Sequence, residues 1–226
     1  MNIPTLFDQI SRACSPDRLE AYRTPGDSDL EVLTRYVWNT CLCEALYPAI
    51  HNLEIGFRNT LHAAIEKSYG DPQWYKDSSI LVEAAGQQRV ADAEWELRRR
   101  GKTVTPGRVV AELHFGFWTS LLSRHFDYPL WRRPGLLRDA FPYMSKHIRK
   151  RHVLAACFGD IRKLRNRVSH HEPIWNRPDL LGEHAGIIEA LGWIAPSLVT
   201  ITRAVDRFQS VHATTYYEQI KASLSS

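Results

Sequence analysis

The 226-residue sequence has few cysteines and no long apolar run, and each absence excludes a class of protein. No stretch of about 18 apolar residues occurs, so no membrane-spanning helix is predicted. Residues 1–10 carry neither the basic segment nor the apolar segment of a secretory signal. The four cysteines lack the density and paired spacing of a disulfide framework or a zinc site. We therefore expect a cytoplasmic, membrane-free protein with reduced, mostly buried thiols and no bound metal or cofactor.

Signals for β-strands and for nucleotide-cofactor enzymes are also missing. There is no convincing alternation of apolar and polar residues and no Asn-Gly hairpin turn. No P-loop, dinucleotide fingerprint, nucleophile elbow or catalytic carboxylate pair stands out. Aromatic residues are spread along the whole chain. We therefore expect an all-α protein in which residues 1–226 form a single domain.

Helix signals fill the chain, and several mark helix ends. Ser28 and Glu31 form a capping-box pattern at the start of a long apolar-periodic stretch. We expect Pro48 to kink or divide that stretch, and Gly70 to end it after Tyr69.

Further helices are expected over 81–100, from Pro106, over about 145–169 and over 180–208, the last with a kink near Pro196. The apolar stripe predicted for this last helix comprises Leu191, Ile194, Leu198, Ile201 and Val205.

Positive charge is concentrated in one segment, residues 146–177. This segment contains nine Lys and Arg residues and only two acidic residues, Asp160 and Glu172, so its net charge is +7. The net charge of the whole chain is +4, so the remainder of the chain carries −3. Such a segment favours an anionic ligand such as phosphate, although a solvated basic face is equally compatible with the charge alone. The basic residues concerned are Lys146, Arg149, Lys150, Arg151, Arg162, Lys163, Arg165, Arg167 and Arg177.

Within this segment, "RNRVSHHEPIW" begins at Arg165 and places His170 and His171 five and six residues later. An Arg followed by a His at similar spacing also occurs from Arg108, Arg177 and Arg207, so the spacing alone is weak evidence. The context of Arg165 is different, because a polar residue follows it directly, the histidine is doubled, and the site lies at the end of an amphipathic helix.

On a regular helix, Arg165 and His170 point about 140° apart. Pro173 disfavours the α conformation at Glu172, so the helix should end there, and an opened last turn could bring His170 toward Arg165. A second copy in a dimer could also supply the missing neighbour. Alternatively, His170 and His171 merely cap the last carbonyls of the helix.

Three blocks together resemble a known family. "LRNRVSHHEPIW", the upstream "NLEIGFRNTL" and "HFGFWTSLLS" are similar to the abortive-infection (Abi-like) branch of the HEPN superfamily, over about residues 28–208. The resemblance implies a HEPN-like helical bundle with additional helices. It also implies a metal-independent endoribonuclease of a prokaryotic antiphage defence or toxin–antitoxin system.

The resemblance further implies that Arg165, the polar Asn166 and His170 are catalytic, with His171 as a less favoured alternative. A histidine titrates near neutral pH and can move protons at an RNA 2′-hydroxyl and a leaving 5′-oxygen. An arginine can stabilise charge that develops on the phosphate. The product would carry a 2′,3′-cyclic phosphate, and DNA would not be cut.

A second group lies upstream. Glu54 and Arg58 have the spacing of a helical ion pair, and this surface pairing is the simpler interpretation. In Abi-like relatives the corresponding helix lies against the motif helix, which implies that Glu54 could position Arg165. Arg58 and Asn59 could then touch substrate.

The resemblance implies RNA as the partner, a homodimer that pairs two motifs, and control by an antitoxin protein or a noncoding RNA. The alternatives are a non-catalytic RNA-binding module and a protein-interaction module of a defence system. Trp175 could stack on a base, although a position in the core or at its rim is more common. The residues expected to bind RNA are Lys146, Arg149, Lys150, Arg151, Arg162, Lys163, Arg167 and Trp175.

Overall fold

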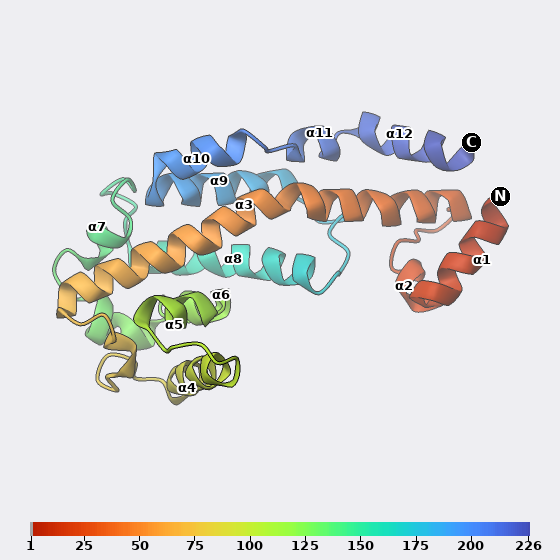
Figure 1. Cartoon of the computed structure of the whole chain (residues 1–226). Coiled ribbons are helices and arrows are strands. Elements are labelled where there is room, and N and C mark those ends of the chain that lie inside the picture. The colour runs from red at the N-terminus through yellow and green to blue at the C-terminus, as the bar shows by residue number, and fades with distance from the viewer. Residues whose placement is uncertain (1) are drawn as a thin grey trace. The chain divides into compact units, whose positions relative to one another are not determined.

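The computed structural model describes residues 2–226, and in this range it contains helices and turns but no strand, which confirms the all-α prediction (Figure 1). Its α-helices are α1 (Ile3–Cys14), α2 (Pro16–Glu20), α3 (Asp29–Tyr69), α4 (Ala84–Arg99), α5 (Pro106–Glu112), α6 (Phe115–Ser120), α7 (Leu136–Ala140), α8 (Arg151–Ser169), α9 (Leu180–Ile194), α10 (Pro196–Arg203), α11 (Phe208–His212) and α12 (Thr214–Ser225). Short helical turns occupy η1 (Trp74–Lys76), η2 (Arg124–Phe126) and η3 (Asp127–Trp131).

Contacts within the chain divide it into two compact units. The first unit comprises the residues up to Ala49, Leu164–Ala185 and Ala204–Ser226, and the second comprises Ile50–Lys163 and Gly186–Arg203. Helices α3, α8 and α9 each contribute to both units. A single domain over the whole chain remains a prediction.

In the first unit, α12 lies beside the N-terminal half of α3 (Figure 1). The indole N–H of Trp38 on α3 donates to the carbonyl of Val211, at 2.7 Å. The same indole meets the ring of Tyr217 edge to face, with centroids 5.5 Å apart. Helix α12 was not expected from the sequence, because its polar composition gives only a weak apolar stripe.

The core of the first unit joins α1 and α2 to the start of α3. Leu19 and Tyr22 are buried against Val32 and Leu33. Partly buried side chains complete this cluster, including those of Leu6, Phe7, Ile10, Tyr36, Trp175 and Leu224.

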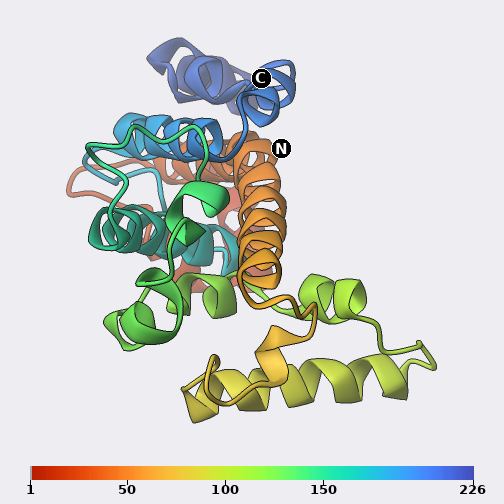
Figure 2. The same ribbon diagram turned by 90° about the vertical axis from the view of Figure 1, so that its left-hand side faces the viewer.

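The second unit is built around a cluster of phenylalanines. The ring centroid of Phe57 on α3 lies 4.2 Å from the ring centroid of Phe158 on α8 and 6.0 Å from that of Phe141. All three are almost fully buried, so they fix the first half of α8. Helices α4 and α5, joined by a short loop, lie next to each other in the same unit (Figure 2).

Several helix ends lie at the positions predicted from local sequence signals. The backbone N–H of Ser28 donates to the Glu31 carboxylate at 2.9 Å, and the N–H of Glu31 lies 3.4 Å from the Ser28 hydroxyl, so the capping box is confirmed. Helix α3 ends at Tyr69, and Gly70 adopts a positive φ of 72°. Only glycine takes this conformation without steric cost.

Other expectations were wrong. Of the two outcomes expected at Pro48, division is wrong, because α3 runs unbroken through this residue and has 41 residues in all. Proline lacks an N–H, so it removes the bond to the carbonyl of Glu44, but packing along both ends of the helix outweighs that loss.

Helix α8 begins at Arg151 rather than near 145, because residues 145–150 form a turn. The stripe predicted for the last helix is confirmed at Leu191 and Ile194, which are buried, but is wrong at Ile201 and Val205, which are 54% and 57% exposed. The chain restarts at Pro196 with a different rotation, and Thr202 is the residue buried there, bonded to Asn52 at 2.9 Å.

The four cysteines are free, but each is half-buried rather than buried. Burial raises the pKa of the Cys43 thiol to about 11 and that of Cys157 to about 12, so both are thiols at neutral pH. Among the helices described, none has the length and apolar character needed to cross a bilayer.

Candidate active site at the end of helix α8

Helix α8 ends in a Schellman motif formed by the sequence-predicted site itself. The N–H of His171 donates to the carbonyl of Val168 at 3.2 Å, and the N–H of Glu172 donates to that of Arg167 at 2.8 Å. His171 has a left-handed φ of 58°, at the position where glycine is usual. Pro173 follows at once and prevents the helix from resuming.

This geometry corrects the expectation that an opened last turn swings His170 toward Arg165. The N–H of His170 still donates to the carbonyl of Asn166 at 2.8 Å, so His170 remains in helical register. The chain reverses only at His171. Arg165 and His170 of one chain therefore project from α8 about 140° apart.

Two arginine side chains bond to residues of this turn. Arg18 on α2 donates from Nη2 to the carbonyl oxygen of His171. Arg167 lies 3.1 Å from the Glu172 carboxylate, in an exposed ion pair. The carbonyl of the left-handed residue and the carboxylate that follows it thus both have cationic partners.

The segment after the turn is anchored by Asn39, an almost fully buried residue of α3. Its Oδ1 accepts the N–H of Ile174 at 2.6 Å and the N–H of Trp175 at 3.1 Å. Its Nδ2 lies 3.2 Å from the hydroxyl of Tyr22. One side chain therefore satisfies two backbone N–H groups that have left the helix.

Trp175 packs against the core of the first unit, with Arg35 over its ring at 4.9 Å. Arg35 also pairs with Asp27. The guanidinium of Arg35, together with Thr24, holds the pKa of Asp27 well below its usual range. The indole N–H of Trp175 is buried without a hydrogen-bond partner. The ring is thus seated on the protein, and stacking on a base stays a prediction.

The residues predicted to be catalytic differ in exposure. Asn166, His170 and His171 are exposed, whereas Arg165 is half-buried and has interaction partners of its own. Exposed polar side chains on a turn fixed by buried contacts can reach a ligand without reorganising the backbone. The histidines and Asn166 are therefore accessible, and Arg165 is constrained.

The predicted RNA-binding residues of the second unit fall into two groups. Three have partners within the chain: Arg149 bonds the Met144 carbonyl, Arg151 pairs with Asp127 at 2.8 Å, and Lys163 pairs with Asp160 at 2.8 Å. Arg149 fixes the turn before α8, and Arg151 is itself the first residue of α8. Only the Lys163–Asp160 pair is well exposed. Lys146, Lys150 and Arg162 are exposed.

The upstream group belongs to the second unit. Arg58 donates to the carbonyl of Ala111 at 3.2 Å, near the C-terminal end of α5, where a cation is favourable. This contact ties α3 to α5. Asn59 is exposed, and Glu54 is half-buried with interaction partners. Contacts of these residues with Arg165 or with substrate stay predictions.

The supporting residues Arg18, Arg35 and Asn39 were not found from the sequence. They lie more than 120 positions before the motif, and no local pattern links them to it. A weak signal was present, because Asn39 is the polar member of a mainly apolar helical face.

Comparison with known protein families identifies the family to which this chain belongs. The family model described as Abi-like protein matches residues 7–176, most of the chain, so this protein belongs to the Abi-like family. The matched region ends just after the turn and includes Arg18, Asn39 and the whole of α8. No match was found among curated proteins or among solved structures.

The left-handed conformation of His171 yields a stability prediction. His171→Gly should raise the free energy of unfolding by about 1 kcal/mol, because glycine removes the steric cost of a positive φ. Urea denaturation followed by circular dichroism measures it. His170→Gly is the control and should lower stability, since His170 is in helical register. A loss on His171→Gly would contradict the account and show that its side chain stabilises the turn.

The Asn39 anchor yields a second prediction. Asn39→Ala should lower the free energy of unfolding by about 2–4 kcal/mol, because the N–H groups of Ile174 and Trp175 lose their acceptor. The matched control is Asn59→Ala, an exposed asparagine on the same helix, which should change stability by less than about 0.5 kcal/mol. Equal effects of the two substitutions in urea denaturation would show that Asn39 does not anchor the turn.

Proposed function

We propose that this Abi-like protein is a metal-independent endoribonuclease of the HEPN type, acting in antiphage defence or as the toxin of a toxin–antitoxin pair. Membership of the Abi-like family suggests a role in abortive-infection defence. The observation that carries the enzymatic proposal is the turn at the end of α8. It presents His170 and Asn166 to solvent on a backbone fixed by buried contacts, at the end of the helix that also carries the half-buried Arg165.

In the proposed reaction, the ribose 2′-hydroxyl attacks the adjacent phosphorus, and the bond to the 5′-oxygen breaks. His170 takes the proton of the 2′-hydroxyl or protonates the leaving 5′-oxygen, which histidine can do near neutral pH. Arg165 stabilises the charge on the phosphate oxygens, and the amide of Asn166 orients the imidazole or a phosphate oxygen. The fragments are a 2′,3′-cyclic phosphate and a 5′-hydroxyl.

The proposed enzyme is a homodimer. Because His170 keeps helical register, the arginine and the histidine of one chain project in different directions from α8. Two copies related by a two-fold axis would bring Arg165 of each chain toward His170 of the other. The exposed cations of residues 146–167 would then line the approach of RNA.

A second candidate function is RNA binding without cleavage. The exposed Lys146, Lys150 and Arg162 favour it, because they supply sequence-independent attraction to phosphates with no catalytic requirement. An antitoxin protein or a regulatory RNA that covers the end of α8 would be the natural controlling partner in either case.

Cleavage is tested by incubating the purified full-length protein with total bacterial RNA in EDTA and sequencing fragments that end in a 2′,3′-cyclic phosphate. We expect His170→Ala to lower cleavage at least about 100-fold, because a positioned acid–base group contributes that much or more. The melting temperature should be unchanged, since His170 is exposed.

The matched control is His152→Ala, which removes an exposed histidine near the start of the same helix and should cut like the wild type. His171→Ala tests which histidine of the pair is catalytic. Unchanged cleavage by His170→Ala, with loss only in His171→Ala, would reassign the role. RNA that is bound but left intact by the wild-type protein would support the binding module instead.

A further inference from the structure

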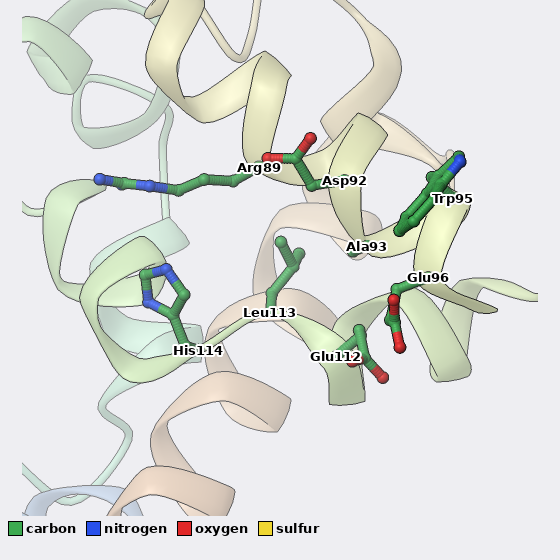
Figure 3. A pocket seen from close by; sticks show the side chains of 8 residues that line it. All are labelled: Arg89, Asp92, Ala93, Trp95, Glu96, Glu112, Leu113 and His114. Atoms are coloured by element: carbon green, nitrogen blue, oxygen red, sulfur yellow. The ribbon is translucent and has the colours of Figure 1, made fainter. Parts of the chain in front are cut away.

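A cavity of about 370 Å³ lies in the second unit, between α4, α5 and the residue that precedes α6 (Figure 3). This volume falls within the range of small-molecule sites. Its floor is apolar, formed by the buried Leu113 and Ala93, and its rim carries charged and aromatic side chains. The proposed ribonuclease chemistry uses none of these residues.

One end of the cavity is cationic. Arg89 on α4 and His114 lie at the same end of the cavity (Figure 3). Arg89 is half-buried, and within residues 2–226 it forms no hydrogen bond or ion pair. A half-buried guanidinium without a carboxylate partner is suited to an anion, and its planar donors match phosphate oxygens.

The opposite end holds Trp95, with Glu96 and Glu112 beside it (Figure 3). Trp95 is 61% exposed, which is unusual for a tryptophan that serves only as packing. The Arg99 guanidinium lies 5.5 Å from the ring centroid, so it covers one face and leaves the other for an aromatic ligand.

Two of the three carboxylates that line the cavity have cationic partners. Glu112 pairs with Arg100 at 2.5 Å, and Glu96 pairs with Arg99 at 2.6 Å. Asp92 accepts from Gln88 at 2.8 Å. Glu96 and Glu112, whose charges are balanced by arginines, can still accept a neutral N–H donor, whereas Asp92 keeps its charge because Gln88 is a neutral donor.

From this arrangement we propose that the cavity binds a purine nucleotide. The phosphate lies at Arg89 and His114, the base stacks on Trp95, and amino groups on the edge of the base donate to Glu112 or Asp92. A purine presents a larger surface for stacking than a pyrimidine. The nucleotide is either free or a purine within single-stranded RNA. This site is independent of cleavage at α8.

The test is isothermal titration of the full-length protein with guanosine monophosphate, adenosine monophosphate, uridine monophosphate and ribose 5-phosphate. We expect the purine nucleotides to bind more tightly than the other two compounds. Trp95→Ala should weaken binding at least about tenfold, Trp95→Phe should restore most of it, and Arg89→Ala should weaken it by about tenfold.

The matched controls are Tyr128→Ala and Arg132→Ala, an exposed aromatic residue and an exposed arginine of the same unit outside the cavity, and they should bind like the wild type. A ribonucleotide tetramer with one purine identifies the source: tighter binding than the mononucleotide favours RNA, and equal or weaker binding favours the free nucleotide. No heat at millimolar nucleotide, or binding that Trp95→Ala and Arg89→Ala leave unchanged, would overturn the proposal.

Discussion

The candidate active site depends on the buried amide of Asn39. Once α8 ends, the backbone N–H of Ile174 is buried and that of Trp175 is partly buried, so both need an acceptor within the protein. The single oxygen of Asn39 accepts both, and its nitrogen bonds Tyr22. This contact determines where the chain runs after the turn. It thereby sets the position of the exposed histidines that precede it.

Local chemistry predicted the parts of the fold that depend on neighbouring residues. The capping box at Ser28, the stop at Gly70 and the end of α8 before Pro173 all follow from backbone donors, backbone acceptors and φ preferences within a few positions. The failures concern tertiary packing. Ile201 and Val205 continue the apolar period of the sequence, but the helix that restarts at Pro196 turns Ile201 to solvent and ends before Val205, which lies exposed in a turn. The anchors Asn39 and Arg18 were missed for the same reason, since they act on residues more than 120 positions away.

The structure also separates the four Arg–His spacings found in the sequence. His184 is buried, stacks on Phe208 and lies 3.1 Å from Asp206, and His212 lies near the same phenylalanine. These two histidines therefore contribute to side-chain packing. His114 lies in the cavity with Trp95, and His170 stands exposed at a helix end. Spacing alone cannot make these distinctions, because they depend on burial and on the end of the helix.

Subunit complementation tests directly whether Arg165 and His170 act together across two copies of the chain. Arg165→Ala and His170→Ala are produced separately and co-expressed with different tags, and the doubly tagged species is assayed for RNA fragments with 2′,3′-cyclic phosphate ends. We expect each variant alone to be inactive and the mixed dimer to recover cleavage at one composite site. A purified mixed dimer that stays inactive, beside an active wild-type dimer, would contradict this expectation.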